Sequence, residues 1–393
     1  MTDLEQKPRL RFKGFTEAWE QRKLNEIVSY ASSSLSAKDA ADDGKWNLYD
    51  ANHLIGKTNL FFVRDDYITI IKDGAGVGRV RLLPKNSAFI GTMGALLPLN
   101  SDLLFDYALL TKADLSRKFS GSTIPHIYFK DYGNETYRTP LLLEQQKIGS
   151  LFERLDSLIT LHQRKYEKLK SMKAALLEKM FPSENETTPK IRFKGFTEAW
   201  EQRKLFEITD KVTEKNAGLQ YVETFTNSAE FGIISQRDFF DHDIAKLGSL
   251  DAYYIVKNED FVYNPRISTS APVGPINRNK LGRTGVMSPL YTVFRPHDID
   301  TTYLEYFFKC GYWHSFMNFN GDSGARSDRF SIRDNVFFQM PIPIPDIDEQ
   351  RKIGELLTCL DNLITLHQRK PSCYQFKLDN ERITKSTSLF SSS

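Results

Sequence analysis

The chain contains an internal repeat, and this repeat restricts its possible folds more than any other feature. Residues 10–27, LRFKGFTEAWEQRKLNEI, recur at 191–208 with two differences, and residues 144–165, EQQKIGSLFERLDSLITLHQRK, recur at 349–370 with six. The two offsets, 181 and 205 residues, are unequal, so the segments between the repeated blocks differ in length as well as in sequence. The pattern predicts a duplicated frame that carries two unlike inserts, which we call the first insert (residues 28–140) and the second insert (residues 209–345).

The second repeated block predicts a long helix from about Glu144 to Met180. Apolar residues recur there at steps of three and four, which places them along one face of a helix. A helix of this length needs a partner along its apolar face, and the copy at 349–370 can supply it. We expect an antiparallel pair related by a pseudo-twofold axis. The second helix is expected to be shorter, because Pro371 interrupts it and the polar residues 371–393 do not continue the apolar pattern.

Both inserts have the patterns of strands and short helices. Residues 67–71 and 79–83 predict a hairpin around a glycine-rich turn, and residues 253–256 and 291–294 predict strands. Short helices are expected at 103–118 and 302–316. The predicted fold class is α+β: two α/β domains separated by two long antiparallel coiled-coil helices, with a pseudo-twofold internal repeat.

The predicted domain boundaries follow the repeat. They are 1–143 for the first domain with its N-terminal repeated segment, 144–181 for the first long helix, 182–190 for a linker, 191–348 for the second domain, 349–370 for the shortened second helix and 371–393 for an atypical polar tail.

Composition excludes several classes of protein. Lys and Arg total 53 against 50 Asp and Glu, a net charge of +3, which excludes a histone-like or polybasic protein. Three cysteines without metal-ligand spacing argue against a disulfide framework or a zinc site and favour a cytoplasmic location. The N-terminal residues lack an apolar signal core, and no stretch of about 18 apolar residues occurs, so we expect neither secretion nor a membrane span.

The sequence offers no catalytic motif. Glycines in Asp73–Gly78 follow a predicted strand, but a second strand pattern follows them in place of the helix that a nucleotide loop requires. Asn264-Pro265-Arg266 resembles the motif of amino-methyltransferases only faintly, because Arg266 replaces a proline. No P-loop, serine-triad or zinc-protease pattern is present at recognisable spacing. We therefore expect no catalytic residue, metal or cofactor in this chain.

Basic residues gather in four windows, two in each insert, and the first three of these windows contain no acidic residue. Any single window can be a merely solvated face, but the four together, mixed with Ser, Thr, Asn and Tyr, favour binding to duplex DNA. Gly121, Lys130 and Asp131 also match Gly324, Arg333 and Asp334 at a constant offset of 203 residues. The predicted DNA-binding residues are Arg79, Arg81, Lys85, Arg117, Lys118, Ser122, Thr123, Lys130, Asn264, Arg266, Arg278, Lys280, Arg283, Arg326, Arg329 and Arg333.

The repeated RFxGFxxxW…RKL opening and EQxKIG…LDxLIxLHQRK helix resemble those of specificity subunits of type I restriction-modification systems, over residues 8 to about 370. The resemblance implies two target recognition domains that each read half of a bipartite, gapped DNA site. It implies that the helices space these domains and dock methyltransferase (modification) subunits, to which restriction (translocase/endonuclease) subunits are added. The chain would then be a non-catalytic subunit, with S-adenosylmethionine, ATP and Mg on its partners and no membrane partner.

The departure at residues 371–393 leaves an alternative open. A truncated or silent allele of such a subunit, with impaired assembly, would have the same sequence pattern. A stand-alone nucleic-acid enzyme, a stand-alone DNA-binding regulator and a coiled-coil scaffold are further alternatives. The bases recognised, the gap length and the methylated adenines are not determined by the sequence of this one chain.

Overall fold

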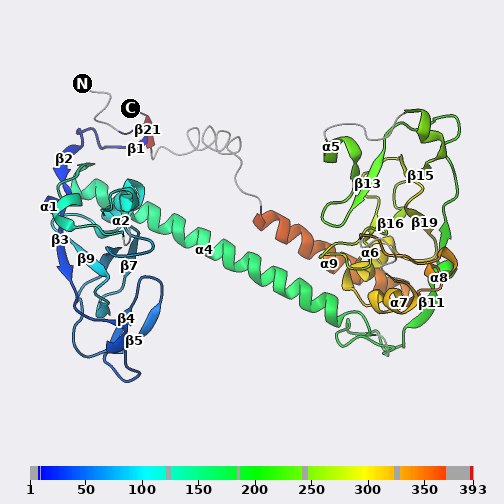
Figure 1. Ribbon diagram of the computed structural model, residues 1–393, viewed down its shortest axis with the longest axis horizontal. Helices are drawn as coiled ribbons and strands as arrows, with labels where there is room; N and C mark the ends of the chain where they lie inside the picture. Colours follow the sequence, from blue (N-terminus) through cyan, green and yellow to red (C-terminus); the bar gives the residue numbers. More distant parts are fainter. Residues whose placement is uncertain are drawn as a thin grey trace. The chain divides into compact units, whose positions relative to one another are not determined.

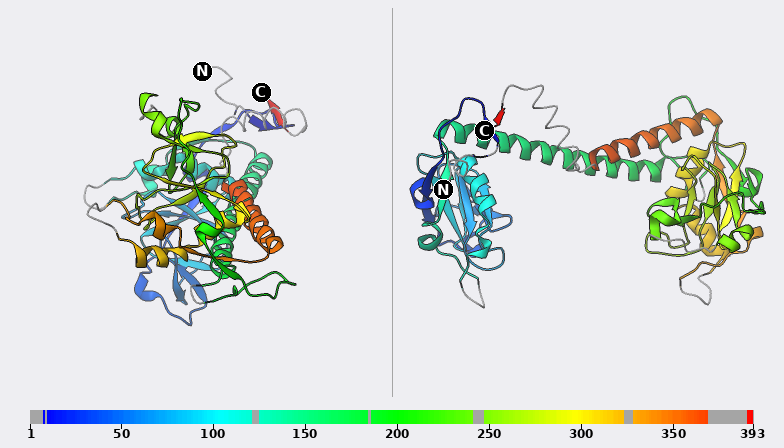
Figure 2. Two further views of the ribbon diagram at one scale, coloured as in Figure 1. Left: turned by 90° about the vertical axis from the view of Figure 1, so that its right-hand side faces the viewer. Right: turned by 90° about the horizontal axis from the view of Figure 1, so that it is seen from above.

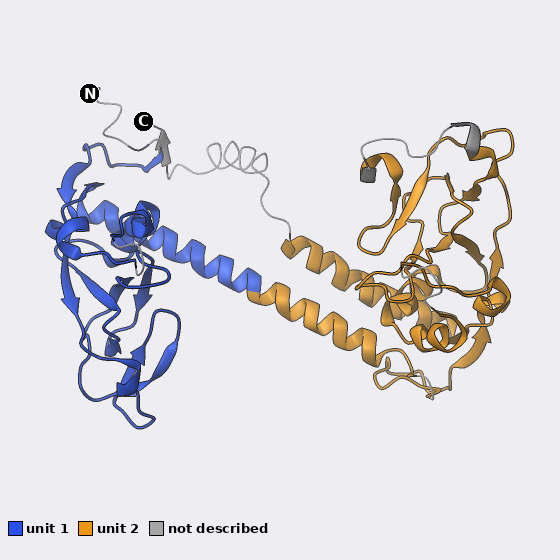
Figure 3. Ribbon diagram, viewed as in Figure 1, with its two compact units in different colours: residues 1–163, 370–393 blue, residues 164–369 orange. Residues whose placement is uncertain are grey.

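The computed structural model describes residues 8, 10–120, 125–183, 186–240, 247–322, 328–368 and 390–392. The chain forms two compact units, residues 1–163 with 370–393 and residues 164–369, and the boundary between them falls inside helix α4 (Leu142–Lys179) (Figure 3). Among the described residues, no helix combines the length and the apolar character needed to cross a membrane.

The first unit is built on an antiparallel sheet in the order β3–β9–β6–β7 (Figure 1). Its strands are β3 (Val28–Ser32), β9 (Met93–Pro98), β6 (Tyr67–Ile71) and β7 (Val80–Leu83). A second sheet, in the order β5–β4–β8, consists of β4 (Trp46–Tyr49), β5 (Leu54–Thr58) and β8 (Ser87–Phe89). Two strand pairs join β2 (Glu20–Lys23) to β10 (Thr136–Thr139) and β1 (Leu10–Phe12) to β21 (Phe390–Ser392). The helices are α1 (Leu24–Ile27), α2 (Leu103–Ala113), α3 (Phe129–Tyr132), the first part of α4, and the 3-10 turns η2 (Ala37–Asp39) and η3 (Leu115–Arg117).

Strand β6 shows how the first unit forms its core. All five of its residues are buried, because both faces of the sheet are covered. Ile68 and Ile70 pack in one apolar cluster with Leu110 of α2, whereas Tyr67 packs with Phe89 in another. The alternation of side chains along a strand directs these neighbours to opposite faces.

The second unit contains a sheet with the same strand order, β12–β19–β16–β17. Its strands are β12 (Thr209–Lys211), β19 (Thr292–Pro296), β16 (Phe261–Tyr263) and β17 (Ile276–Arg278). Three strand pairs join β11 (Glu201–Lys204) to β20 (Pro341–Ile344), β13 (Phe225–Ser228) to β14 (Gly232–Ser235), and β15 (Tyr254–Val256) to β18 (Gly285–Met287). The helices are α5 (Gln236–Phe240), α6 (Thr301–Cys310), α7 (Trp313–Asn320), α8 (Asp334–Phe337), α9 (Ile347–Gln368), and the 3-10 turns η4 (Leu205–Glu207) and η5 (Leu247–Ala252).

Helix α9 packs antiparallel against the C-terminal part of α4, within the second unit (Figure 2). Lys173 Nζ is 2.5 Å from Asp361 Oδ1, and Gln368 Nε2 donates to the Tyr166 hydroxyl at 2.7 Å, so residue numbers rise along one helix as they fall along the other. Leu169 belongs to the apolar core against which the partly buried leucines and isoleucine of α9 pack. The predicted antiparallel helix pair is confirmed.

The duplicated frame is reproduced by equivalent interactions in the two units. A glutamate near the start of α4, and another near the start of α9, each accept two hydrogen bonds from an arginine of the first repeated block. Arg11 pairs with Glu144 (Nε–Oε1 2.8 Å), and Arg192 pairs with Glu349 (Nε–Oε1 2.7 Å). The next residue, Gln145 or Gln350, accepts the backbone N–H of the aspartate that caps α2 or α6, at 3.0 and 2.9 Å.

The predicted hairpin is confirmed, since β6 pairs with β7 and Tyr67 lies opposite Leu83. The predicted long helix is observed at Leu142–Lys179. The prediction of unbroken helices at 103–118 and 302–316 was wrong. Helix α2 ends at Ala113 because Asp114 adopts a left-handed φ of +47°, and α6 ends at Cys310 because Gly311 does so at +80°. Residues beyond these breaks form η3 and α7.

Candidate nucleic-acid interface

The first basic window of the first insert lies on and after strand β7. The Arg79 guanidinium is exposed and donates to the Ala51 carbonyl oxygen at 2.7 Å and to Asn52 Oδ1 at 2.5 Å. Arg81 lies over the Tyr49 ring, 5.4 Å from its centroid, and its Nη1 is buried without a hydrogen-bond partner. The Lys85 side chain is exposed. Within the described residues, none of these three cations has a carboxylate partner, so all three stay candidates for DNA contact.

The second window of the first insert is only partly available. Arg117 pairs with Asp114 at 3.2 Å, and Lys118 pairs with Glu135 at 2.6 Å. Lys130 lies over the Tyr128 ring, 5.1 Å from its centroid. Both ion pairs are exposed and can exchange for phosphate contacts at little cost. The predicted contacts Ser122 and Thr123 lie outside the described residues.

Three predicted residues of the second insert's first basic window form ion pairs within the protein. Arg278 is nearly buried and pairs with Glu305 at 2.6 Å and Glu259 at 3.0 Å. Lys280 shares Glu305 at 3.3 Å, and Arg283 binds Glu223 through two hydrogen bonds of 2.7 Å. This sequence window contains no Asp or Glu, but the fold places glutamates from other segments of the chain beside its basic residues. Their contact with DNA stays a prediction, but we assign these three residues no part in the proposals below, because a carboxylate already holds each cation.

Two of these carboxylates, Glu223 and Glu305, have lowered pKa values, which favours their charged form. The hydrogen bonds from Arg283 lower the pKa of Glu223. Burial alone would raise the pKa of Glu305, but the neighbouring cations outweigh burial and lower it. A charged carboxylate that already holds an arginine competes with a DNA acceptor for the same guanidinium.

Other predicted residues of the second insert converge around a groove of about 450 Å³. The segment of Asn264 and Arg266 pairs with the segment of Arg329, since Phe330 N donates to the Pro265 carbonyl oxygen at 2.7 Å. Arg266 is exposed, and Arg329 lines the groove. The remaining lining includes Lys211, Tyr254, Tyr263, Pro265, Leu290, Tyr291 and Asp334.

Arg333 precedes helix α8 and is exposed, as is Lys130, its predicted counterpart in the first insert. Arg326 lies outside the described residues. Arg266, Arg329 and Arg333 have no carboxylate partner among the described residues, so the second insert retains a cationic surface beside an aromatic groove. Aromatic rings and arginines side by side suit both base edges and phosphates.

Sequence reasoning missed one pair of the first insert. His126 Nδ1 contacts Asp73 Oδ1, and both side chains are about a quarter to a third exposed, at 26% and 30%. In the sequence, Asp73 stands out only as the first residue of the glycine-rich segment Asp73–Gly78. Asp73 and His126 are 53 positions apart, and the strand arrangement brings them together. Only an alignment of the first insert with the second could have indicated this pairing from the sequence.

Known proteins have a similar sequence or a similar fold. The sequence model of the family described as "Type I restriction modification DNA specificity domain" matches residues 16–171 and 197–372. The chain is 24% identical over 383 residues to the type I restriction enzyme MjaVIII specificity subunit of Methanocaldococcus jannaschii, covering 90% of this chain and 88% of that protein.

A solved structure has a similar fold. The type I restriction-modification S subunit from M. genitalium has a TM-score of 0.54 at 15% identity, covering 96% of this chain and 97% of that one. The duplicated frame, the two unlike inserts and the family match over both repeats lead to one conclusion. The chain belongs to the type I restriction-modification specificity subunits, the non-catalytic subunits responsible for DNA sequence recognition in these systems.

Proposed function

We propose that this chain selects a bipartite, gapped duplex site, with each insert reading one half, and that it docks methyltransferase subunits, to which restriction subunits are added. One observation carries the proposal: the two inserts share a sheet of the same strand order but present different side chains from it. Two domains with the same backbone frame and different surface side chains are suited to recognise two different short DNA sequences. The gap would correspond to the spacing of the two inserts on the frame.

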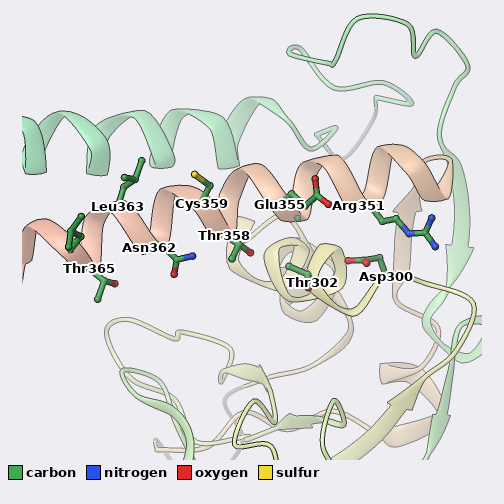
Figure 4. A pocket seen from close by; sticks show the side chains of 11 residues that line it. Asp300, Thr302, Arg351, Glu355, Thr358, Cys359, Asn362, Leu363 and Thr365 are labelled. Carbon is green, nitrogen blue, oxygen red and sulfur yellow. The ribbon is translucent and has the colours of Figure 1, made fainter.

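The repeated frame offers two open surfaces for the methyltransferase subunits. A groove of about 700 Å³ runs along α9 and is bordered by Asp300 and Thr302 at the start of α6 (Figure 4). Its α9 lining includes Glu355, Cys359 and Leu366. In the first unit, a groove of about 470 Å³ lies between the N-terminal segment of Phe12 and Phe15 and the start of α4. Each groove is lined partly by a long helix of the repeated frame, on which we propose that the methyltransferase subunits dock.

The chemistry would belong to the partners. We place S-adenosylmethionine on the methyltransferase subunits and ATP and Mg on the restriction subunits, and we place the assembly in the cytoplasm with its DNA. The part of the chain that the structure describes contains no group of three His, Cys, Asp or Glu residues arranged to hold a metal. This chain's own contribution would be affinity and sequence choice.

Reconstitution tests the proposal. The full chain is combined with methyltransferase subunits of its system, and modified adenines in plasmid DNA are mapped by sequencing, with each component omitted in turn. We expect methylation at one gapped motif only when the chain and the methyltransferase are both present. Methylation by this chain alone, or methylation by its partner at the same motif without it, would contradict the proposal.

A second candidate, an allele impaired in assembly, rests on one observation. Some side chains of α4 are exposed although the equivalent side chains of α9 are buried. Phe152 of α4 is 46% exposed, whereas Leu357, its equivalent in α9, is 0% exposed. If the exposed side chains of α4 lack a packing partner, a methyltransferase subunit would dock more weakly on α4. Mass measurement of the reconstituted complex separates the two candidates, because two bound methyltransferase subunits favour the first and one or none favours the second.

A further inference from the structure

The two inserts contain an equivalent strand pairing at which the side chains differ completely. In the first insert, Asp73 pairs with His126 in an isolated antiparallel bridge; in the second, Arg266 pairs with Arg329. In the first insert the flanking backbone hydrogen bonds run from Gly74 N to the Pro125 oxygen and from Ile127 N to the Lys72 oxygen, both 3.0 Å. In the second they run from Ile267 N to the Asp328 oxygen at 3.0 Å and from Phe330 N to the Pro265 oxygen at 2.7 Å.

These bonds make the two pairings equivalent residue by residue. One strand of each bridge continues beyond β6 or β16, which hold the same place in the two sheets. On the other strand, His126 and Arg329 differ by 203 residues, which is also the offset between Lys130 and Arg333. Asp73 therefore corresponds to Arg266, and His126 corresponds to Arg329.

The hydrogen-bond pattern also fixes where the paired side chains lie. Residues that are opposite each other and flanked by such bonds form a non-hydrogen-bonded pair, in which the two side chains lie close together on one face. Asp73 and His126 contact each other there, carboxylate against imidazole ring. Arg266 and Arg329 bring two positive charges to the same place, where neither has a carboxylate partner within the described residues.

Two adjacent arginines without a counter-ion destabilise a strand pair, so their arrangement favours a ligand rich in acceptors. Arginine can bind the O6 and N7 acceptors of guanine through two hydrogen bonds in the major groove. A carboxylate instead accepts from the amino group of cytosine, or of adenine, and a histidine ring can donate to a purine N7. The same backbone position thus carries two different base preferences.

We propose that this pairing is a specificity-determining element of both inserts: Arg266 and Arg329 select guanine in one half-site, and Asp73 and His126 select an amino-bearing base, cytosine or adenine, in the other. This inference rests on the proposed function. It also explains why the two inserts, built on one sheet, need not recognise the same half-site.

Substitution of the arginine pair tests the inference. In the full chain with its methyltransferase subunits, the doubly substituted R266K/R329K keeps both charges but loses the planar fork that binds guanine through two hydrogen bonds. We expect discrimination for guanine at one position of one half-site to fall roughly tenfold to a hundredfold. The salt dependence of binding and the other half-site should stay unchanged. A thermal melt confirms that each variant folds.

The reciprocal variant D73R/H126R tests the first insert. We expect its half-site to change from an amino-bearing base to guanine at one position. The matched control E223Q/R283Q removes an arginine that is already bound by a carboxylate, and it should leave both half-sites as in the wild type.

Different failures have different signatures. If R266A/R329A weakens binding to all sequences alike and lowers the salt slope by about two, the arginines hold phosphates and the inference is wrong. If the variants recognise the wild-type motif unchanged, the inference is wrong while the proposed function stands. If the wild-type complex methylates no defined motif, the proposed function itself fails.

Discussion

The carboxyl group of Asp106 in helix α2 is a buried titratable group of the first insert. It is fully buried, and burial raises its pKa to about 7. Ser101 Oγ lies 2.5 Å from Asp106 Oδ2 and 2.8 Å from the Ile27 carbonyl oxygen. One hydroxyl hydrogen cannot serve both acceptors, whereas a protonated Asp106 can donate to Ser101, which then donates to Ile27.

This raised pKa predicts a pH dependence of stability. The folded state keeps a proton that the unfolded state releases near pH 4, so the contribution of Asp106 is complete below about pH 4 and is lost as pH rises toward 7. We expect Asp106→Asn, which keeps a donor toward Ser101, to slow hydrogen exchange of α2 amides at pH 8 and to change little at pH 4. Exchange rates are corrected for intrinsic pH effects. An equal change at both pH values would show that ionisation of Asp106 is not the cause.

Two equivalent glycines provide a matched pair of substitutions. A Cβ on Gly149 would lie 2.4 Å from Asp102 Oδ1, the oxygen that caps α2, and 2.9 Å from Phe105 N. A Cβ on Gly354 would meet Thr302 Cγ2 at 3.1 Å and Asp300 Oδ1 at 3.5 Å, which small shifts can relieve. Gly149→Ala should therefore destabilise α2 by at least the value of a helix cap, about 1 kcal/mol. Gly354→Ala should have a smaller effect on α6.

Hydrogen exchange of α2 and α6 amides measures both variants in one chain. The wild-type protein and each single variant are compared under the same conditions. If the two glycine variants loosen their helices equally, the closer contact around Gly149 has no energetic consequence, and this prediction is wrong.

At the scale of elements, the helices of the frame are unequally covered. Leu155 and Ile159 of α4 are 42% and 65% exposed. Their counterparts in α9 pack in the core of the second unit, and Leu360, the counterpart of Leu155, is 3% exposed. The difference arises because α9 packs on the C-terminal part of α4, while the sequence after α9 begins with Pro371 and lacks the apolar pattern of Tyr166–Phe181. The α4 stripe of Phe152, Leu155 and Ile159 is thus an apolar face that no helix among the described residues covers.

Restoring the missing partner is expected to change the behaviour of the isolated chain. The wild type should self-associate through this stripe. A variant in which residues 371–393 are replaced by a copy of residues 166–181 should be monodisperse and should bind the methyltransferase subunit more tightly, since the graft supplies about four turns of matching helix. Light scattering and a pull-down compare the two chains.

A control graft separates packing from length. It carries Ser at the positions copied from Leu169, Met172 and Leu176, and should behave like the wild type. A wild-type chain that is already monodisperse and binds two methyltransferase subunits would contradict the prediction and exclude the impaired-assembly candidate.

At the scale of the whole molecule, each insert has its own core and its own surface residues. Apolar clusters of the first insert contain Ile68 and Tyr67, and those of the second contain Phe225 and Val262. The frame interactions Arg11–Glu144 and Arg192–Glu349 lie outside both inserts. The core of each insert also contains residues of the repeated blocks, such as Leu24 and Ile27 in the first unit and Leu205 and Leu357 in the second, so an exchanged insert has to pack on the same frame residues.

We expect exchange of residues 28–140 for the corresponding insert of another family member to change one half-site only. Sequencing of methylated DNA from the reconstituted complex measures both half-sites together. A matched exchange of residues 209–345 should change the other half. Simultaneous change of both halves after one exchange would show that the inserts do not read independently.

The sequence by itself determined the duplicated frame, the long helix, its second copy and the presence of two different inserts. These follow from local periodicity and from repetition, which need no knowledge of distant contacts. The predicted interruption of that copy at Pro371 lies outside the described residues. The early ends of α2 and α6 were missed, because a left-handed residue at Asp114 or Gly311 does not interrupt an apolar pattern. Family membership could be recognised for the same reason, since the repeated blocks are continuous in sequence.

Only the tertiary structure decided which charged residues are available. Arg278 and Arg283 lie in a window free of acid, yet Glu305 and Glu223 reach them from other segments. The sheet likewise brings Arg266 beside Arg329. Sequence windows record neighbours along the chain, whereas electrostatic pairing depends on distance in space, so the fold alone shows which arginines are already held by a carboxylate.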